Sequence, residues 1–197
     1  MKHYFTDGTL IDFELDPLNT FEFSNLLKNL SLEGRFCNQV PWSVLQHSIA
    51  VGKACEMLYP GNIVLIQLGY LHDISEAIIR DVPTPIKKLV GNAWYNMEEE
   101  IQDKLLNYLH VSKLGDEDED CLAEVDKTMA FVEACNFYSE EQVEYMKMQQ
   151  GYEPEIIICC TTAFNMVHGI DIVDEENGGL SQDITDIYKQ VIYATIM

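Results

Sequence analysis

Apolar residues recur at helical spacing along most of the 197-residue chain. Phe23, Leu26 and Leu30 lie on one face at this spacing and predict a helix that Gly34 ends. The same periodicity predicts six further helices, over residues 44–59, 63–79, 94–110, 121–137, 156–168 and 181–194. The segment 139–150 fits either another helix or a mobile loop.

The first fifteen residues follow a strand-like pattern instead. Two short runs of apolar and β-branched residues flank the dipeptide Asp7-Gly8, which suits a type I′ turn because it tolerates positive φ. We therefore expect a β-hairpin over residues 3–15. Further on, Ser43 and Gln46 form an S-x-x-Q capping box, so a helix is expected to begin just after Ser43. No internal repeat or long linker divides the chain, and we expect one all-α domain over residues 1–197 with a small N-terminal hairpin.

Acidic residues dominate the charge. The chain has 33 Asp and Glu residues against 12 Lys and Arg, a net charge of −21, while 47% of its residues are hydrophobic. The apolar content is enough for a packed core, which excludes a wholly disordered chain. The negative charge argues against binding to polymeric nucleic acid or to anionic membrane surfaces. With no apolar run near the roughly 20 residues that span a bilayer, no signal-peptide pattern and no C-x-x-C pair among six cysteines, we expect a cytoplasmic protein with reduced thiols.

Ionisable side chains interrupt the apolar helices at a few positions. His72 and Asp73 are adjacent within the second of the six further helices, and Glu76 follows about one turn after His72. His47 and Asp126 interrupt two other helices. An unpaired charge is costly in apolar surroundings, so these side chains are expected to share a compensating partner.

Two imidazoles and two carboxylates from three helices could meet at one cation. This mixed set of nitrogen and oxygen ligands favours Mn, Co, Zn or Fe(II) over Ca, and ligands from three helices would leave positions for water and substrate oxygens. Taken singly, each residue also fits a hydrogen-bonded role in the core or on the surface. The order His, His-Asp, Asp across an all-helical chain is the more specific signal.

The sequence around these residues is similar to that of a known family. Ser43-Val44-Leu45-Gln46-His47-Ser48 resembles S-V-A-[EQ]-H-S, and LHDISEA (71–77) followed by DVPTPIK (81–87) resembles H-D-x-x-E…G-D-[LM]-P-x-P-[IVL]-K. These are patterns of the HD-domain phosphohydrolase superfamily, in its YfbR-like 5′-deoxynucleotidase branch, and Arg35-Phe36 matches the Arg-aromatic pair of that branch. The resemblance covers about residues 4–137.

The chain departs from the family pattern at four places. Asn38 and Arg80 stand where the branch commonly has glycine, and Val125 replaces a small residue before the last Asp. Arg35 also lies 12 positions before His47, a slightly shorter spacing than the family pattern leads us to expect. We expect these changes to affect the shape of the Arg35 loop, and with it base preference, more than the metal site.

The resemblance implies an HD-domain helical bundle with a core over about residues 20–137, followed by C-terminal helices over 139–197. It implies that a single divalent transition metal ion (Mn, Co, Zn or Fe) is held by His47, His72, Asp73 and Asp126. It implies that Glu76 activates or orients the attacking water or protonates the leaving oxygen, and that Asp81 assists the water or contacts the sugar. It implies contacts to phosphate, sugar or base from Arg35, Phe36, Lys87 and Lys88, while surface exposure alone would explain the two lysines equally well. Trp42 could stack on a base or could pack ahead of the helix as a hydrophobic staple.

The resemblance implies a metal-dependent phosphohydrolase that acts on (deoxy)nucleotides. Release of phosphate from 5′-deoxynucleoside monophosphates is the first expectation, and hydrolysis of deoxynucleoside triphosphates to triphosphate is the alternative. A two-metal enzyme of this superfamily would need further histidines between the His-Asp pair and the last Asp, where only His110 lies. A non-catalytic nucleotide-binding protein is the remaining alternative.

The expected partners are a small nucleotide and further copies of the chain. Tyr145, Met146, Met148 and Tyr152 could form an apolar patch that joins a dimer or higher homo-oligomer, although ordinary core packing would account for the same residues. If the gene belongs to a phage, the expected location is the cytoplasm of its host.

Overall fold

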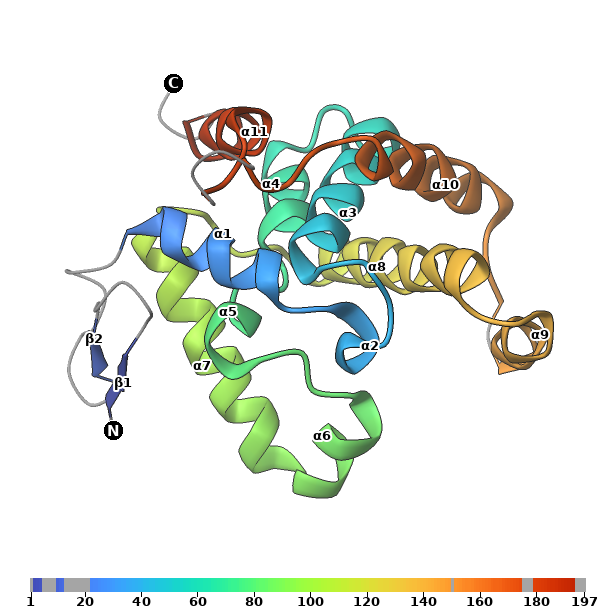
Figure 1. Cartoon of the computed structure of the whole chain (residues 1–197), viewed down its shortest axis with the longest axis horizontal. Helices are drawn as coiled ribbons and strands as arrows, with labels where there is room; N and C mark the ends of the chain where they lie inside the picture. The colour runs from blue at the N-terminus through green and yellow to red at the C-terminus, as the bar shows by residue number, and fades with distance from the viewer. Residues whose placement is uncertain (1, 5–9, 13–21, 150, 175–178, 194–197) are drawn as a thin grey trace.

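Helices make up almost all of the part of the chain that the structure describes, which is residues 2–4, 10–12, 22–149, 151–174 and 179–193 (Figure 1). In this computed structural model the helices are α1 (Phe23–Leu32), α2 (Arg35–Asn38), α3 (Val44–Leu58), α4 (Ile63–Leu71), α5 (Glu76–Ile79), α6 (Thr84–Val90), α7 (Asn92–Tyr108), α8 (Asp116–Phe137), α9 (Glu140–Gln149), α10 (Pro154–His168) and α11 (Gln182–Tyr193). The predicted all-α class is confirmed. No helix in these ranges is long and apolar enough to cross a lipid bilayer.

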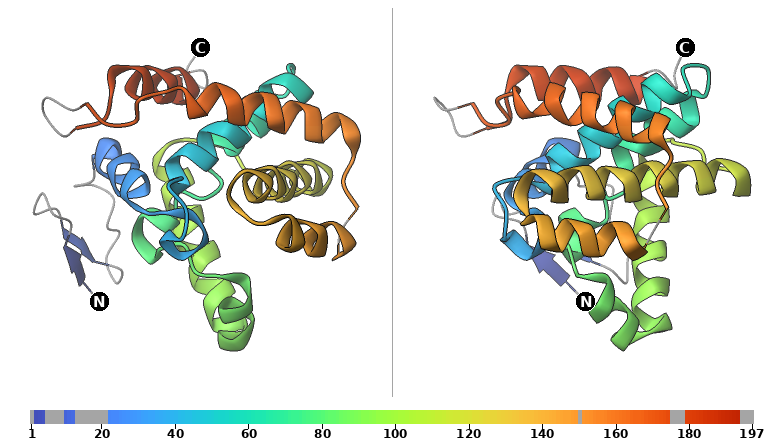
Figure 2. Two further views of the ribbon diagram at one scale, coloured as in Figure 1. Left: turned by 45° about the vertical axis from the view of Figure 1, so that its right-hand side comes forward. Right: turned by 90° about the vertical axis from the view of Figure 1, so that its right-hand side faces the viewer.

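Helix α3 lies at the centre and packs against α4, α8 and α10 (Figure 2). The predicted capping box starts it: the Ser43 hydroxyl accepts a hydrogen bond from the Gln46 amide at 3.2 Å, and the Gln46 side chain accepts one from the Ser43 amide at 2.9 Å. Most of the helix up to Cys55 is buried. A helix enclosed on most sides must hide any polar group it carries, and His47 is one such group.

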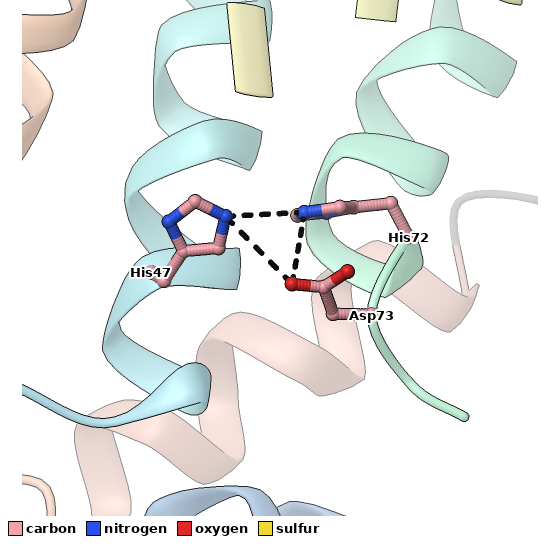
Figure 3. Close-up of side chains that lie close together, drawn as sticks. All are labelled: His47, His72 and Asp73. Carbon is pink, nitrogen blue, oxygen red and sulfur yellow. Dashed lines mark hydrogen bonds and ion pairs between the residues drawn. The ribbon is translucent and has the colours of Figure 1, made fainter. Parts of the chain in front are cut away.

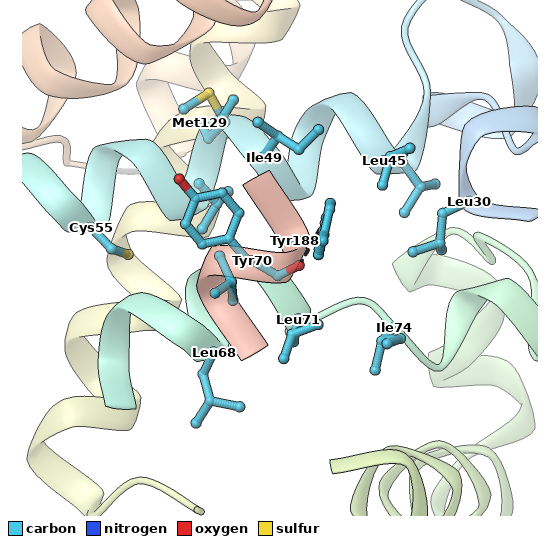
Figure 4. Packing of buried hydrophobic residues seen from close by; sticks show 14 of the residues in the cluster. Leu30, Leu45, Ile49, Cys55, Leu68, Tyr70, Leu71, Ile74, Met129 and Tyr188 are labelled. Carbon is cyan, nitrogen blue, oxygen red and sulfur yellow. Dashed lines mark hydrogen bonds between the residues drawn. The ribbon is translucent and has the colours of Figure 1, made fainter. Parts of the chain in front are cut away.

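Helices α3 and α4 approach closely because a glycine on each helix faces the other. A Cβ added to Gly69 would lie 3.0 Å from the Cα of Gly52 and 2.9 Å from the Sγ of Cys55, so a larger residue would force the helices apart. This close packing sets the separation of the two helices that carry His47 and His72. Figure 4 shows buried side chains of the surrounding core, among them Leu45, Ile49, Leu71 and Met129.

The continuous helix predicted over residues 63–79 is wrong in its middle. Helices α4 and α5 are separated by turns over residues 72–75. His72 keeps helical backbone angles (φ −60°, ψ −33°), but the turns that follow have hydrogen bonds between residues three apart, such as that from the Ile74 amide to the Leu71 carbonyl. The apolar pattern hid the break because Ile74, within the turn, is as buried as the helix residues before it.

Two other boundaries differ from the predictions. The helix predicted over 121–137 begins earlier, because the acidic segment 116–120 forms the start of α8. Carboxylates in a first helical turn interact favourably with the helix dipole, which explains why so acidic a segment is helical. Helix α6 lies outside the predicted helix ranges, and Pro85 fits in its first turn, where its missing N–H costs nothing. Segment 140–149 is helical, one of its two predicted alternatives.

The connection between α1 and α3 contains a left-handed turn. Phe36, Cys37 and Asn38, the last three residues of α2, have φ of 53°, 59° and 59°. L-residues pay about 1–2 kcal/mol each for this conformation. The turn is held by a hydrogen bond from the Gly34 amide to the Asn38 side-chain oxygen at 2.8 Å and by one from the Arg35 amide to the Trp42 carbonyl at 2.8 Å.

Two short strands precede the helices. β1 (Lys2–Tyr4) and β2 (Leu10–Asp12) pair antiparallel, with His3 opposite Ile11. The turn predicted at Asp7-Gly8 lies outside the described residues.

Candidate metal centre

Three of the predicted metal ligands converge on one point (Figure 3). His47 Nε2, on α3, lies 3.3 Å from His72 Nε2 and 3.7 Å from Asp73 Oδ2, and the last two atoms are 3.3 Å apart. His47 is fully buried, whereas His72 and Asp73 are partly exposed. The group therefore lies at the inner end of an opening rather than sealed in the core.

The fourth predicted ligand, Asp126, reaches the same place from α8. Its Oδ1 atom is 2.9 Å from His47 Nε2 and 3.6 Å from His72 Nε2. The four predicted side chains thus come from three separate parts of the chain: α3, the turn after α4, and α8.

Both imidazoles present the same ring nitrogen to this point. His72 Nδ1 lies 2.9 Å from the carbonyl oxygen of Gly69, which can only accept a hydrogen bond, so Nδ1 carries the hydrogen. His47 Nδ1 lies 2.7 Å from Oε1 of Glu133, a buried carboxylate. In the neutral state each ring therefore turns an unprotonated Nε2 toward the centre, which is the form that binds a metal ion.

The carboxylates stabilise positive charge at the centre. Burial lowers the pKa of His72, but the charge of Asp73 and hydrogen bonds to Asp73 and Asp126 outweigh it and raise that pKa well above 6.5. Burial and the charge of Arg35 also lower the pKa of His47, yet Glu133 and Asp126 raise it overall. The imidazolium charges in turn hold the pKa of Asp73 below its ordinary value despite burial. A bound cation would supply the positive charge that protons supply in its absence.

A side chain from α7 holds the turn that carries two of these groups. Gln102 donates from Nε2 to the Leu71 carbonyl at 2.8 Å, and its Oε1 accepts a hydrogen bond from the Ser75 amide at 3.1 Å. The two bonds close the turn at both ends, so His72 and Asp73 are fixed between them.

A cavity of about 450 Å³ opens beside the centre. Its wall includes the predicted ligands Asp73 and Asp126, which makes the cavity continuous with the centre. The other predicted site residues that line it are Arg35, Phe36, Glu76, Asp81 and Lys87. Seven residues were predicted for catalysis or for contacts to the substrate. Five of them line this cavity together with two of the predicted ligands, whereas Trp42 and Lys88 do not.

Arg35 is held between two carboxylates. Its Nη1 lies 3.5 Å from Asp73 Oδ2, and its Nε lies 3.5 Å from Glu133 Oε2. Although burial disfavours the charged guanidinium, Glu133, Asp73 and Asp126 raise its pKa, so it stays charged. The left-handed turn begins directly after it, so strained backbone carries this cation and the neighbouring Phe36 to the cavity.

Glu76 is a buried carboxyl group in the cavity wall. Burial, together with the charges of Asp73 and Asp81, raises its pKa from 4.5 to about 9. Lys87 Nζ is 3.6 Å from Glu76 Oε1 and 2.6 Å from Glu98 Oε1, so it is more tightly paired with Glu98. The raised pKa favours the protonated form of Glu76, and a protonated carboxyl group in a cavity wall is a candidate proton donor. Burial raises the pKa of Asp81 as well.

Two predicted contact residues lie elsewhere. Trp42 is 2% exposed, donates its indole N–H to Glu133 at 2.7 Å and packs on Phe164 with ring centroids 4.6 Å apart. Its burial agrees with packing ahead of α3, one of its two predicted roles, rather than with stacking on a base. Lys88 is exposed on α6 and does not line the cavity, whereas Thr84 and Lys87 of the same helix do.

The residues predicted to join copies of the chain do not share one environment. Tyr145 is 66% exposed on α9, whereas Tyr152 stacks on Phe131 with ring centroids 4.2 Å apart. The side chain of Met148 lies outside the described residues. The homo-oligomer stays a prediction.

Three residues at the site were not predicted. Glu133 bonds His47, Gln102 closes the turn, and Tyr138 lines the cavity with its ring centroid 5.1 Å from that of Phe36. Glu133 had a signal in the sequence: it lies seven residues after Asp126, two helical turns along the same face, within an otherwise apolar run. Gln102 lies in the amphipathic helix α7 and Tyr138 at the end of α8, and no feature of the sequence marks either as a site residue.

Comparisons of the chain with models of known protein families and with curated proteins find no match.

Proposed function

We propose that this protein is a metal-dependent phosphohydrolase of the HD-domain type that acts on small nucleotides. The observation that carries the proposal is the convergence of His47, His72, Asp73 and Asp126 beside a cavity. A cation site next to a guanidinium, a protonated carboxyl group and aromatic rings fits hydrolysis of a phosphate ester attached to an organic group.

The donor set suits one divalent transition metal. Ligand atoms about 2.0–2.2 Å from one ion lie about 3.0–3.5 Å from each other. The two imidazole Nε2 atoms lie between 2.9 Å and 3.7 Å from each other and from the nearest oxygens of Asp73 and Asp126. Two imidazole nitrogens with two carboxylates favour Mn, Co, Zn or Fe(II) over Ca. When bound, such an ion supplies positive charge for a phosphate oxygen and lowers the pKa of water.

The remaining chemistry falls to the side chains of the cavity. Arg35 would bind phosphate oxygens through the planar guanidinium, which suits that geometry. Water would add to phosphorus as the ester P–O bond breaks, and Glu76, protonated by its raised pKa, would give its proton to the leaving oxygen. Asp81 would take a proton from the water. Phe36 and Tyr138 offer ring surface for the sugar or base.

The charge around the cavity favours one phosphate group over three. Among the described residues that line it, the only basic side chains are Arg35 and Lys87, and Lys87 is already paired with Glu98. A phosphomonoester carries about −1.5 to −2 charges at neutral pH, and a triphosphate carries more. The cation and Arg35 already face the carboxylates Asp73, Asp126 and Glu133, so each additional phosphate would add negative charge that no further basic residue of the described lining offsets. A nucleoside monophosphate is therefore the proposed substrate.

Backbone conformation at two departures from the family pattern also supports the proposal. Asn38 and Arg80 stand where the resembling branch has glycine, and their φ values are 59° and 76°. Positive φ is the conformation that glycine adopts most easily. The backbone thus keeps the shape that glycine would favour, although the side chains differ.

A substrate panel tests the proposal. Deoxynucleoside and ribonucleoside monophosphates and deoxynucleoside triphosphates would be incubated with the protein and Mn(II), and orthophosphate and triphosphate would be measured separately. We expect orthophosphate from monophosphates and none from the matched Asp73→Asn protein. Triphosphate release would favour the alternative substrate, and an inert panel would favour a non-catalytic nucleotide-binding protein.

A further inference from the structure

We infer that Glu133 is a positioning residue that orients the metal ligand His47 and thereby sets the affinity of the centre for its cation. The inference rests on the proposed metal centre and concerns a residue that contacts no ligand position itself. Glu133 lies on α8 with no exposed surface. Its distance of two turns from Asp126 means that one face of α8 supplies both a ligand and the support for another ligand.

One oxygen of Glu133 serves two donors. Oε1 accepts from His47 Nδ1 at 2.7 Å and from Trp42 Nε1 at 2.7 Å. Trp42 immediately precedes the cap of α3, and His47 lies in the first turns of that helix. The shared acceptor therefore fixes the imidazole plane relative to the start of its own helix, and it fixes which ring nitrogen faces the centre.

The second oxygen is held less firmly. Oε2 lies 3.5 Å from Arg35 Nε, and neither atom has a hydrogen-bond partner within the described part of the chain. Oε1 faces two N–H donors and Oε2 faces the Arg35 guanidinium, so the groups around this carboxyl favour its anionic form. The carboxylate is thus ionised, and both of its 2.7 Å hydrogen bonds are accepted by Oε1, the oxygen that faces His47. An anionic acceptor on Nδ1–H makes Nε2 a stronger donor to a metal ion.

The arrangement provides its own spectroscopic reporter. The chain contains two tryptophans, Trp42 and Trp94, so a Trp94→Phe protein would have Trp42 as its single indole. Charge drawn toward His47 by a cation would weaken the bond from the Trp42 indole to the shared Oε1. We expect the fluorescence of Trp42 to change when Zn(II), which is diamagnetic, is added to chelator-treated Trp94→Phe protein.

Glu133→Gln in this background tests the inference. The amide keeps the size and one oxygen acceptor but removes the charge. We expect Zn(II) affinity, measured by calorimetry, to fall about 10- to 100-fold, with a smaller fluorescence change. Glu56→Gln is the matched control, because Glu56 accepts the Tyr70 hydroxyl at 2.7 Å from the same α3 helix but lies nine residues after His47. We expect its affinity to equal that of the parent.

A second variant keeps the inference testable if Glu133→Gln does not fold. Glu133→Asp keeps the charge but withdraws the carboxylate by one methylene, and it is expected to weaken Zn(II) binding in the same direction. Parent-like affinity in whichever variant shows a native circular dichroism spectrum would overturn the inference and leave the metal centre in place. A parent protein that binds no Zn(II) would overturn the proposed function, and the inference with it.

Discussion

Gln102 on α7 donates a hydrogen bond to the carbonyl oxygen of Leu71 at 2.8 Å, so the end of α4 is fixed by a helix that contributes no metal ligand. The other end of the same amide accepts from the backbone of Ser75. Between these two bonds lie His72 and Asp73. The geometry of the centre thus depends on a side chain outside it.

Replacing Gln102 with leucine should loosen this turn. The change keeps the volume but leaves the Leu71 carbonyl and the Ser75 amide without their partner, which costs about 1–3 kcal/mol per unsatisfied buried group. We expect a lower urea midpoint and weaker Zn(II) binding. Gln142→Leu is the control, because Gln142 makes a similar pair of bonds at the exposed start of α9. Equal effects in the two variants would contradict a special role for Gln102.

Removal of the cation or of one ligand charge should stop phosphate release. We expect EDTA to abolish it and Mn(II) or Co(II) to restore it, since four donors that favour such ions converge here. Asp73→Asn should lose activity with little loss of helicity, because it removes a charge rather than core volume. Full activity in chelator, or an active Asp73→Asn protein, would refute the metal role.

Arg35→Ala should raise KM and lower kcat on nucleoside monophosphates. The guanidinium is the cation that lines the cavity without a tight partner, since its distances to Asp73 and Glu133 are both 3.5 Å. Steady-state kinetics at saturating Mn(II) would measure both parameters. Arg35→Lys, which keeps the charge but loses the planar fork, should recover only part of the loss. Kinetics identical to the parent would place the phosphate elsewhere.

The raised pKa of Glu76 predicts a pH dependence of stability in chelator-treated protein. The unfolded chain releases the proton of this carboxyl group near pH 4.5, whereas the folded protein keeps it up to about pH 9. Because the folded state binds more protons in this window, its stability falls as pH rises through it. Glu76→Gln cannot ionise, so its stability relative to the parent should increase from pH 5 to pH 9. Urea denaturation at several pH values would measure this, and parallel profiles would contradict it.

The sequence allowed prediction of the helices and of most residues around the cavity, for identifiable reasons. Helical periodicity located α3 and α10, and buried ionisable residues such as His47 stood out against apolar neighbours. The break before α5 could not be predicted, because the buried Ile74 continues the apolar pattern through it. The burial of Trp42 depends on Glu133 and Phe164, which are 91 and 122 residues away in the chain. Local patterns carry no information about such contacts.

Arg80 offers a test of backbone strain next to the site. Its φ of 76° and ψ of 160° lie in a region that is essentially restricted to glycine, and occupying it costs about 1–3 kcal/mol. Its side chain forms an ion pair with Glu33 at 2.7 Å, in which the Arg80 side chain is 59% exposed and that of Glu33 is 10% exposed. Solvent at the Arg80 side limits the contribution of the pair to about 1 kcal/mol. Arg80→Gly should therefore stabilise the protein by about 1 kcal/mol.

Arg80→Ala separates the two contributions. It loses the same ion pair with Glu33 but keeps a Cβ in the strained conformation, so it should be slightly less stable than the parent. Urea midpoints of the two variants and the parent would give the order glycine, arginine, alanine. If Arg80→Gly proved less stable than the parent, the ion pair would outweigh the strain, and the glycine-like shape of this turn could no longer be counted in favour of the HD-type proposal.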